Sequence, residues 1–196
     1  SQHSEVAVKV LHTVGASAEF MREMNLLANL HHPNILQLYG VTRGSFSPGG
    51  NSPLQWMMVC EYMVNGSLHQ LLHKNPSKVI SWSTKLRILV EVAKGMSFLH
   101  SDLPAKTRIA HLDLKPDNVL LGSSPATIKV ADFGVSRGGQ RTAGSAAAQT
   151  GTYEYMGPEF YWGTGVGTAA DVYSFGIMMW EVETRTLVMR GMLEAV

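Results

Sequence analysis

The side chains best suited to chemistry gather in one short segment, His111 to Asn118, which reads HLDLKPDN. Pro116 among Asp, Lys and Asn residues predicts a loop here, rather than a helix or a strand. A carboxylate such as that of Asp113 can take a proton from a hydroxyl group, and Lys115 sets a positive charge close to it in the chain. Carboxylate and amide oxygens are also the hard ligands that Mg²⁺ prefers. The segment therefore predicts a loop that handles protons, anions and a divalent cation.

Three further short blocks accompany this loop in a fixed order. VAVK precedes it at 6–9, whereas DFG at 132–134 and GPE at 157–159 follow it. Each block is a weak signal alone, because a strand lysine is usually a solvated surface charge and DFG is a common tripeptide. In this order, on predicted strands and loops, the four blocks resemble the signature set of the protein kinases. The chain is therefore identified as a member of the eukaryotic protein kinase catalytic domains, with an α+β, two-lobed fold.

The resemblance implies phosphoryl transfer from ATP, in which the protein mainly positions groups and neutralises charge. Asp113 is expected to accept the proton of the substrate hydroxyl or to orient that hydroxyl. Lys115 is expected to stabilise charge on the transferred phosphoryl group. Asn118 and Asp132 are expected to bind Mg²⁺ through their side-chain oxygens.

The VAVK block supplies the phosphate contact that the resemblance implies. Lys9 alternates with the core-facing positions of its strand and is expected to reach the ATP phosphates. Glu23 lies on the next predicted helix, where the family carries a glutamate that pairs with the strand lysine. Without Lys9 upstream, the simpler interpretation of Glu23 would be an exposed side chain on a helix surface.

The adenine pocket is also given by the resemblance. Ala7 and Leu120 resemble the residues that sandwich the adenine ring. Glu61 and Met63 fall in the hinge, where backbone groups would bind adenine, and Cys60 takes the gatekeeper position behind it. The alternative for Cys60 is a small buried core thiol, and nothing in the sequence would activate it.

The substrate class follows from the pattern around Lys115. By resemblance, D-x-K-x-x-N marks kinases that act on Ser or Thr of protein substrates in signalling, and Thr152 in GTYEYMGPE agrees. The segments HHPNIL at 31–36 and EYMVNGSL at 61–68 resemble the tyrosine-kinase-like group. We therefore expect a serine/threonine kinase of that group, whose upstream regulators the sequence does not identify.

Hydrophobic periodicity predicts the elements that position these residues. Strands are expected at 5–11, 35–41, 54–62, 119–121 and 128–130, and helices at 18–30, 68–73, 83–99 and 169–183. Ser81 is a plausible N-cap. Loops rich in small residues are expected at 44–53 and 137–149. The strand-rich first third and the helix-rich remainder predict an N-lobe at 1–62 and a C-lobe at 63–196.

A stack of side chains is expected to hold the two lobes together, and one acidic residue is expected to anchor the catalytic loop. By resemblance, Leu27, Leu38, His111 and Phe133 form the stack that connects the lobes in active kinases. Asp171 resembles the carboxylate that anchors the backbone of the catalytic loop. Its simpler interpretation is an acidic residue that stabilises the start of a helix.

The sequence departs from the family at its ends and beside Asp113. Only residues 1–5 precede VAVK, where the family has a Gly-rich loop, and the helices after 169–183 are missing or replaced. We therefore expect a domain that is incomplete at both ends. The alternative function is a catalytically inactive truncated kinase or pseudokinase that acts as a protein-binding module. Leu112 replaces the Arg that normally neutralises a phosphate on the activation loop, which argues against such a switch.

Composition excludes several other classes. The chain has 16 basic and 15 acidic residues, a net charge of +1, which argues against a dedicated nucleic-acid surface. The single cysteine, Cys60, excludes an internal disulfide and any zinc site built from several thiolates. The N-terminal residues lack the features of a signal peptide, and no apolar run is long enough to span a bilayer. A cytoplasmic protein is the expectation.

Two histidines have the spacing of a zinc pair. His69 and His73 are four residues apart on a predicted helix. Gln70 stands where a metalloprotease would carry glutamate, and no third ligand is evident in the sequence. The expectation is therefore a solvated helix face.

Overall fold

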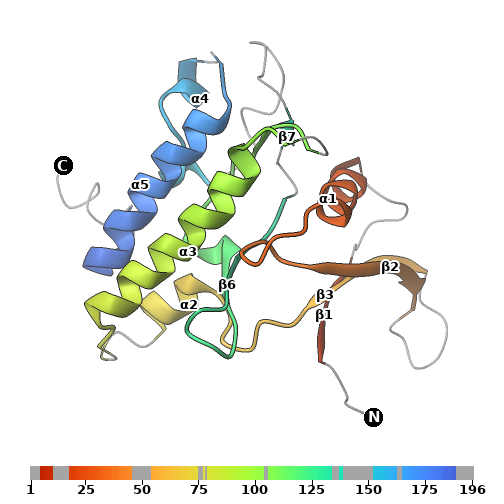
Figure 1. Ribbon diagram of the computed structural model, residues 1–196, viewed down its shortest axis with the longest axis horizontal. Coiled ribbons are helices and arrows are strands. Elements are labelled where there is room, and N and C mark those ends of the chain that lie inside the picture. Colours follow the sequence, from red (N-terminus) through yellow and green to blue (C-terminus); the bar gives the residue numbers. More distant parts are fainter. Residues whose placement is uncertain are drawn as a thin grey trace.

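Strands and helices separate along the chain, with a sheet in the first third and the long helices after it (Figure 1). This computed structural model describes residues 5–10, 18–45, 54–74, 77, 79–103, 106–133, 137–138, 152–162 and 165–188. Gly134 and most of the loops expected at 44–53 and 137–149 lie outside these residues. The mixture of a three-stranded sheet, two two-stranded sheets and separate helices is the α+β fold that the sequence predicts.

The first group of elements is a three-stranded antiparallel sheet in the order β1-β3-β2. Its strands are β1 (Val6–Val10), β2 (Leu38–Gly44) and β3 (Gln55–Glu61). The helix α1 (Ala18–Ala28) packs on the sheet, where Phe20 meets the inward side chains Met58 and Cys60. This packing places α1 beside the strand that carries Lys9.

The second strand begins later than the sequence predicts, because residues 34–36 pair with the C-lobe instead. The Val130 amide donates to the Asn34 carbonyl at 2.9 Å, and the Leu36 amide donates to the Val130 carbonyl at 2.9 Å. The Asn34 side chain, which is buried, donates to the carbonyl of Ile128 at 2.9 Å. A Cβ atom at Gly95 would lie 2.8 Å from the Asn34 carbonyl oxygen. The segment after α1 is therefore fixed to the larger lobe.

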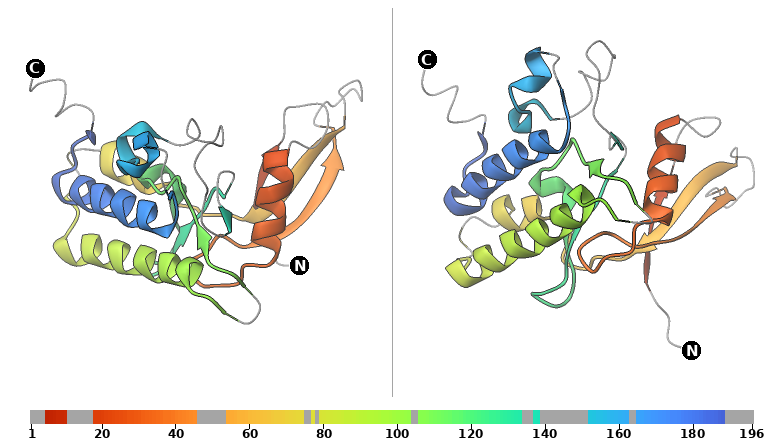
Figure 2. Two further views of the ribbon diagram at one scale, coloured as in Figure 1. Left: turned by 90° about the horizontal axis from the view of Figure 1, so that it is seen from above. Right: turned by 45° about the horizontal axis from the view of Figure 1, so that its top comes forward.

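The second group of elements is built on α2 (Leu68–His73), α3 (Trp82–His100) and α5 (Thr168–Thr184). Helices α3 and α5 lie side by side in both views (Figures 1 and 2). Ser81 caps α3 by accepting a hydrogen bond from the Thr84 amide, as predicted. Val92, Leu99 and Met178 are fully buried in the core between these helices. No helix of the described residues has the length and apolar character needed to cross a bilayer.

Short elements between α3 and α5 carry the catalytic-loop segment. They are β4 (Ile109–Ala110), η1 (Pro116–Asn118), β5 (Val119–Leu121), β6 (Ile128–Val130), β7 (Arg137–Gly138), η3 (Tyr153–Tyr155) and α4 (Glu159–Trp162). The hairpin β5–β6 has the bounds that the sequence predicts. The pairing of β4 with β7 was not predicted, because two-residue strands leave no periodic pattern.

Candidate active site

The loop between β4 and β5 holds the Asp113 carboxylate in a network of donors. The Asn118 amide nitrogen donates to the Asp113 carbonyl at 2.8 Å and to its carboxylate at 3.0 Å. The amide and the hydroxyl of Thr152 both donate to the other carboxylate oxygen at 3.1 Å. The Lys115 ammonium lies 3.0 Å from Asp113 and donates to the Thr152 hydroxyl at 2.6 Å. The residues expected to handle the proton and the phosphoryl charge therefore lie together.

A second cluster joins the sheet to the DFG segment. The Lys9 ammonium donates to both Glu23 carboxylate oxygens at 2.7 and 2.8 Å, and to Asp132 at 3.2 Å. Glu23 is only 4% exposed, so it is not a solvated helix side chain. Burial lowers the pKa of Lys9, but the Glu23 and Asp132 carboxylates outweigh burial, and the net effect is a raised pKa. Lys9 therefore stays charged at neutral pH.

A cavity of about 240 Å³ lies between these two clusters. Its lining comes from both lobes: Ala7, Lys9, Glu23, Leu27, Leu36, Met58, Cys60, Asp117, Asn118, Leu120, Ala131 and Asp132. Ala7 and Leu120, the residues expected to flank adenine, are both in this lining. The hinge residues Glu61 and Met63 are not.

The hinge side chains point into the protein instead. The Glu61 carboxylate lies 2.8 Å from the Lys129 ammonium and accepts a bond from the Gln37 amide at 2.6 Å. Met63 is buried. Any contact of these two residues with a ligand in the cavity must therefore use their backbone groups, as the sequence analysis expects.

Cys60, on β3, has no feature of a reactive thiol. Its side chain is buried and packs with Phe20 and Met58. Burial raises the pKa of Cys60 to about 11, and the Glu23 carboxylate adds to the rise. A neutral thiol is a poor nucleophile, so Cys60 contributes shape to the cavity rather than reactivity.

A larger hollow of about 520 Å³ lies elsewhere, between α2, the start of α3 and the β5–β6 hairpin. Among the described residues of its lining, Lys74 is the only charged one, and none of the predicted site residues is present there. We assign the site to the smaller cavity, because its lining combines the Lys9 ammonium with the Asp132 carboxylate, as the binding of a metal-bound polyphosphate requires.

The buried carboxylate of Asp171 anchors the backbone of the loop that carries Asp113. It is 1% exposed and accepts bonds from the backbone amides of His111 at 2.8 Å and Leu112 at 2.7 Å. The His100 imidazole lies 2.7 Å from the same carboxylate. Leu112 has φ of 67°, a left-handed conformation that these bonds help to hold. His100 was missed by sequence reasoning, because it lies 71 residues from Asp171 in the chain.

The four residues expected to form a stack lie in or against one core. His111 and Phe133 are fully buried, with ring centroids 5.1 Å apart. Leu27 belongs to the same cluster as Phe133, and the partly buried Leu38 packs against it. The His111 ring also lies 3.0 Å from the Ala131 carbonyl. The core is therefore continuous from α1 to the DFG segment.

Comparison with known proteins decides the family. Residues 1–189 match the family model described as protein tyrosine and serine/threonine kinase. The chain belongs to the protein kinase family.

Curated relatives of this kinase domain agree. It is 40% identical over 187 residues to the probable serine/threonine-protein kinase drkB of Dictyostelium discoideum. That alignment covers 93% of this chain and 25% of drkB. It is 37% identical over 186 residues to the serine/threonine-protein kinase CTR1 of Arabidopsis thaliana. That alignment covers 92% of this chain and 21% of CTR1. The chain thus spans about a quarter or less of these two relatives.

Protein kinases use ATP and divalent metal ions, and the donor set of the cavity fits both. The Asn118 amide nitrogen is turned to Asp113, which leaves the amide oxygen for a cation. The Asp132 carboxylate is half exposed and lines the same cavity. The Lys9 ammonium lies 3.2 Å from Asp132 and would meet the nucleotide phosphates. These oxygens and this ammonium would hold a metal-bound polyphosphate.

Proposed function

We propose that the protein containing this domain transfers the γ-phosphoryl group of ATP to serine or threonine hydroxyls of protein substrates, with Mg²⁺ as the divalent ion. The observation that carries the proposal is the cluster of Asp113, Lys115 and Thr152, which Asn118 joins to the cavity that Lys9 and Asp132 line. Mg²⁺ fits better than a softer ion, because the available ligands are carboxylate and amide oxygens.

In the proposed mechanism, Asp113 accepts the proton of the substrate hydroxyl through its carboxylate. Its two oxygens are already oriented by Asn118 and Thr152, so little reorganisation is required when the substrate arrives. Lys115, next to Asp113, stabilises negative charge on the phosphoryl group as it moves to the hydroxyl. Bound Mg²⁺ would supply further neutralisation of phosphate charge.

Lys9 binds the phosphates from the opposite side of the cavity. Its ammonium is held by Glu23 and reaches Asp132, so one side chain connects α1, β1 and the DFG segment. We infer that this contact aligns the phosphates with Asp113. Serine and threonine are the proposed acceptors because Lys115 lies in the D-x-K-x-x-N pattern, and because the relatives above are described as serine/threonine kinases.

The test is a kinase assay on the full-length protein with labelled ATP and a mixed protein substrate, followed by phosphoamino-acid analysis. We expect phosphoserine and phosphothreonine in the presence of Mg²⁺ and none in the matched Asp113→Asn variant. Thermal shift with ATP, with and without Mg²⁺, measures binding separately. ATP binding without any transfer would favour the alternative of an inactive binding module.

A further inference from the structure

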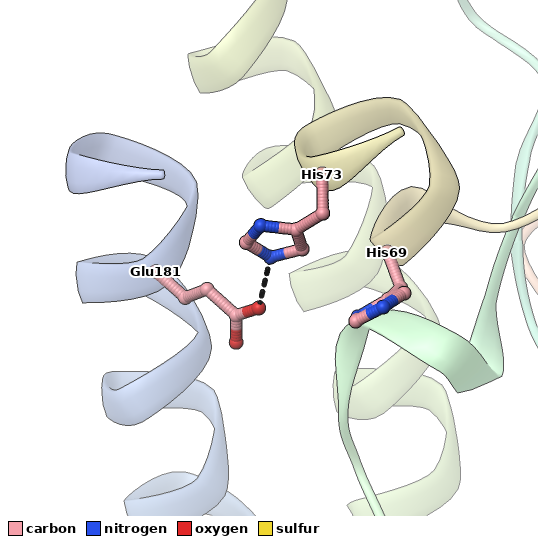
Figure 3. Close-up of side chains that lie close together, drawn as sticks. All are labelled: His69, His73 and Glu181. Atoms are coloured by element: carbon pink, nitrogen blue, oxygen red, sulfur yellow. Dashed lines mark hydrogen bonds and ion pairs between the residues drawn. The ribbon is translucent and has the colours of Figure 1, made fainter. Parts of the chain in front are cut away.

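A buried glutamate lies beside the two histidines of α2. Glu181 comes from α5, far along the chain, and its side chain extends toward His73 (Figure 3). His69 and His73 lie one helical turn apart on α2, with ring centroids separated by 4.8 Å. One ligand atom from each of the three residues lies within 4.8 Å of the others. The third donor that was not evident in the sequence therefore comes from another helix, and the expected solvated helix face is wrong for His73, whose side chain is 16% exposed.

The glutamate is already oriented for a ligand. Glu181 is 0% exposed, and one carboxylate oxygen lies 2.7 Å from His73 Nε2. The hydroxyl of Tyr155 donates to the other oxygen. Burial and the bond to Glu181 raise the pKa of Tyr155, so this hydroxyl remains a donor. Such outer partners fix the orientation of metal-binding carboxylates.

His69 also has a carboxylate neighbour. Asp117 in η1 lies 3.7 Å from His69 Nδ1. A carboxylate beside one ring nitrogen leaves the other nitrogen for a metal and raises its basicity. Asp117 is thus suited to orient His69, in the way that Tyr155 orients Glu181.

We propose that His69, His73 and Glu181 form a zinc-binding site, with water as the fourth ligand. Two imidazoles and one carboxylate are a recurring ligand set for Zn²⁺, whereas Mg²⁺ selects all-oxygen sites. Zinc would bind His73 Nε2 and the Glu181 carboxylate in place of the hydrogen bond between them, and the neutral imidazole would carry its proton on Nδ1.

The geometry requires only small side-chain movements. Tetrahedral zinc with bonds of about 2.0–2.1 Å separates its ligand atoms by about 3.3 Å. The His73–Glu181 pair must open slightly from 2.7 Å. His69, whose side chain is 36% exposed, must move closer, and its exposure leaves it room to do so.

Bound zinc would join α2 to α5 on the side of the C-lobe that carries Tyr155. It would act as a clamp that stabilises the folded domain, because the unfolded chain holds no preformed site. None of the three zinc ligands lines the cavity of Asp132 and Asn118, although Asp117, the neighbour of His69, does.

The experiment titrates the chelator-treated full-length protein with Zn²⁺ by calorimetry, in excess Mg²⁺ to occupy oxygen-only sites. Melting temperature is recorded in parallel. We expect wild type to bind one more zinc than His69→Gln, or to bind it at least about tenfold more tightly. We also expect wild type to melt about 5 °C higher with saturating zinc. His69→Gln is the decisive variant, because it removes one ligand and leaves the His73–Glu181 bond intact.

His31→Gln is the matched control, since this exposed histidine lies in the turn after α1. It should keep the zinc binding and the thermal shift of wild type. Equal zinc stoichiometry, affinity and thermal shift in wild type and His69→Gln would overturn the proposal. A zinc effect lost equally in His31→Gln and His69→Gln would also overturn it.

Discussion

The catalytic loop and the Lys9 cluster face the same cavity, but they are held in different ways. The loop is anchored through backbone amides to the buried Asp171 carboxylate. The Lys9 side chain is 50% exposed, and within the described part of the chain its ammonium is held by side-chain contacts to Glu23 and Asp132. Backbone bonds to a buried charge resist rearrangement, whereas an ion pair at a half-exposed ammonium is easily broken. The comparison indicates a rigid loop around Asp113 and an adjustable Lys9 cluster, which is the proposed phosphate contact.

The largest effect is expected at the centre of the rigid region. Asp113→Asn removes the proton acceptor and should lower kcat by about 10³-fold with little change in stability. Asp102→Asn, at an exposed carboxylate paired with Arg108, is the control and should leave kcat near wild type. Near-normal turnover of Asp113→Asn would show that the loop is not the catalytic centre.

Loss of the Asp171 carboxylate should lower the free energy of unfolding far more than changes in the Lys9 cluster do. Asp171→Asn leaves the amides of His111 and Leu112 without their charged acceptor and should lower the free energy of unfolding by about 3 kcal/mol. Urea denaturation of the full-length protein measures this. A loss below about 1 kcal/mol would contradict the rigid-anchor interpretation.

Cys60 reports whether the small sheet opens. Its pKa of about 11, against an ordinary 9.0, predicts a thiolate fraction near pH 8 about 100-fold below that of a free thiol. Alkylation by iodoacetamide should therefore be at least that much slower than for glutathione, and ATP should not accelerate it. Rapid alkylation would mean that the sheet around β3 opens easily.

The adjustable contact should show a smaller effect on activity and almost none on stability. Glu23→Gln removes the charge that holds Lys9 and should lower kcat/KM by about 30-fold through misalignment of the phosphates. The free energy of unfolding should fall by about 1 kcal/mol or less, because Lys9 is half exposed. If Glu23→Gln destabilises the protein as much as Asp171→Asn, the distinction between the regions fails.

The smallest effect is expected from activation-loop phosphorylation. Leu112 packs in an apolar cluster with Met156 and Phe160, where the family's usual arginine would hold a phosphate. Candidate acceptors such as Thr142 and Ser145 lie outside the described residues. Phosphatase treatment of the active full-length protein should change its activity by less than about tenfold. A larger loss that follows loop dephosphorylation, checked by mass spectrometry, would refute this.

The sequence predicted the elements that carry a strong local pattern. Helix α2, strands β5 and β6 and the Ser81 cap have the predicted positions, because capping and alternation are local signals. The start of β2 was wrong, since long-range pairing with Val130 replaces the local preference of Ile35 and Leu36 for the sheet. The lobe boundary near Tyr62 remains a prediction.

The site residues that lie in local motifs were predicted, whereas their long-range partners were not. Motif order identified Asp113, Lys115 and Asp132 before any geometry was available, although their roles remain predictions. The partners His100 and Glu181 could not be predicted, because each meets its contact across a large sequence separation and neither lies in a recognisable motif. Alignment of many homologues, with covariation between α2 and α5, is the signal that would have found Glu181.

The attachment of residues 34–36 to the C-lobe fixes the C-terminal end of α1, so the helix can tilt only about that end. The end of α1 nearest Asn34 is held, so any tilt of the helix displaces Glu23 more than Leu27, in the manner of a lever. Gly95 allows residues 34–36 to approach α3 this closely, because an added Cβ would lie only 2.8 Å from the Asn34 carbonyl oxygen. We expect Gly95→Ala to misalign Glu23 with Lys9 without touching either residue, and a double-mutant cycle with Glu23→Gln would measure that coupling.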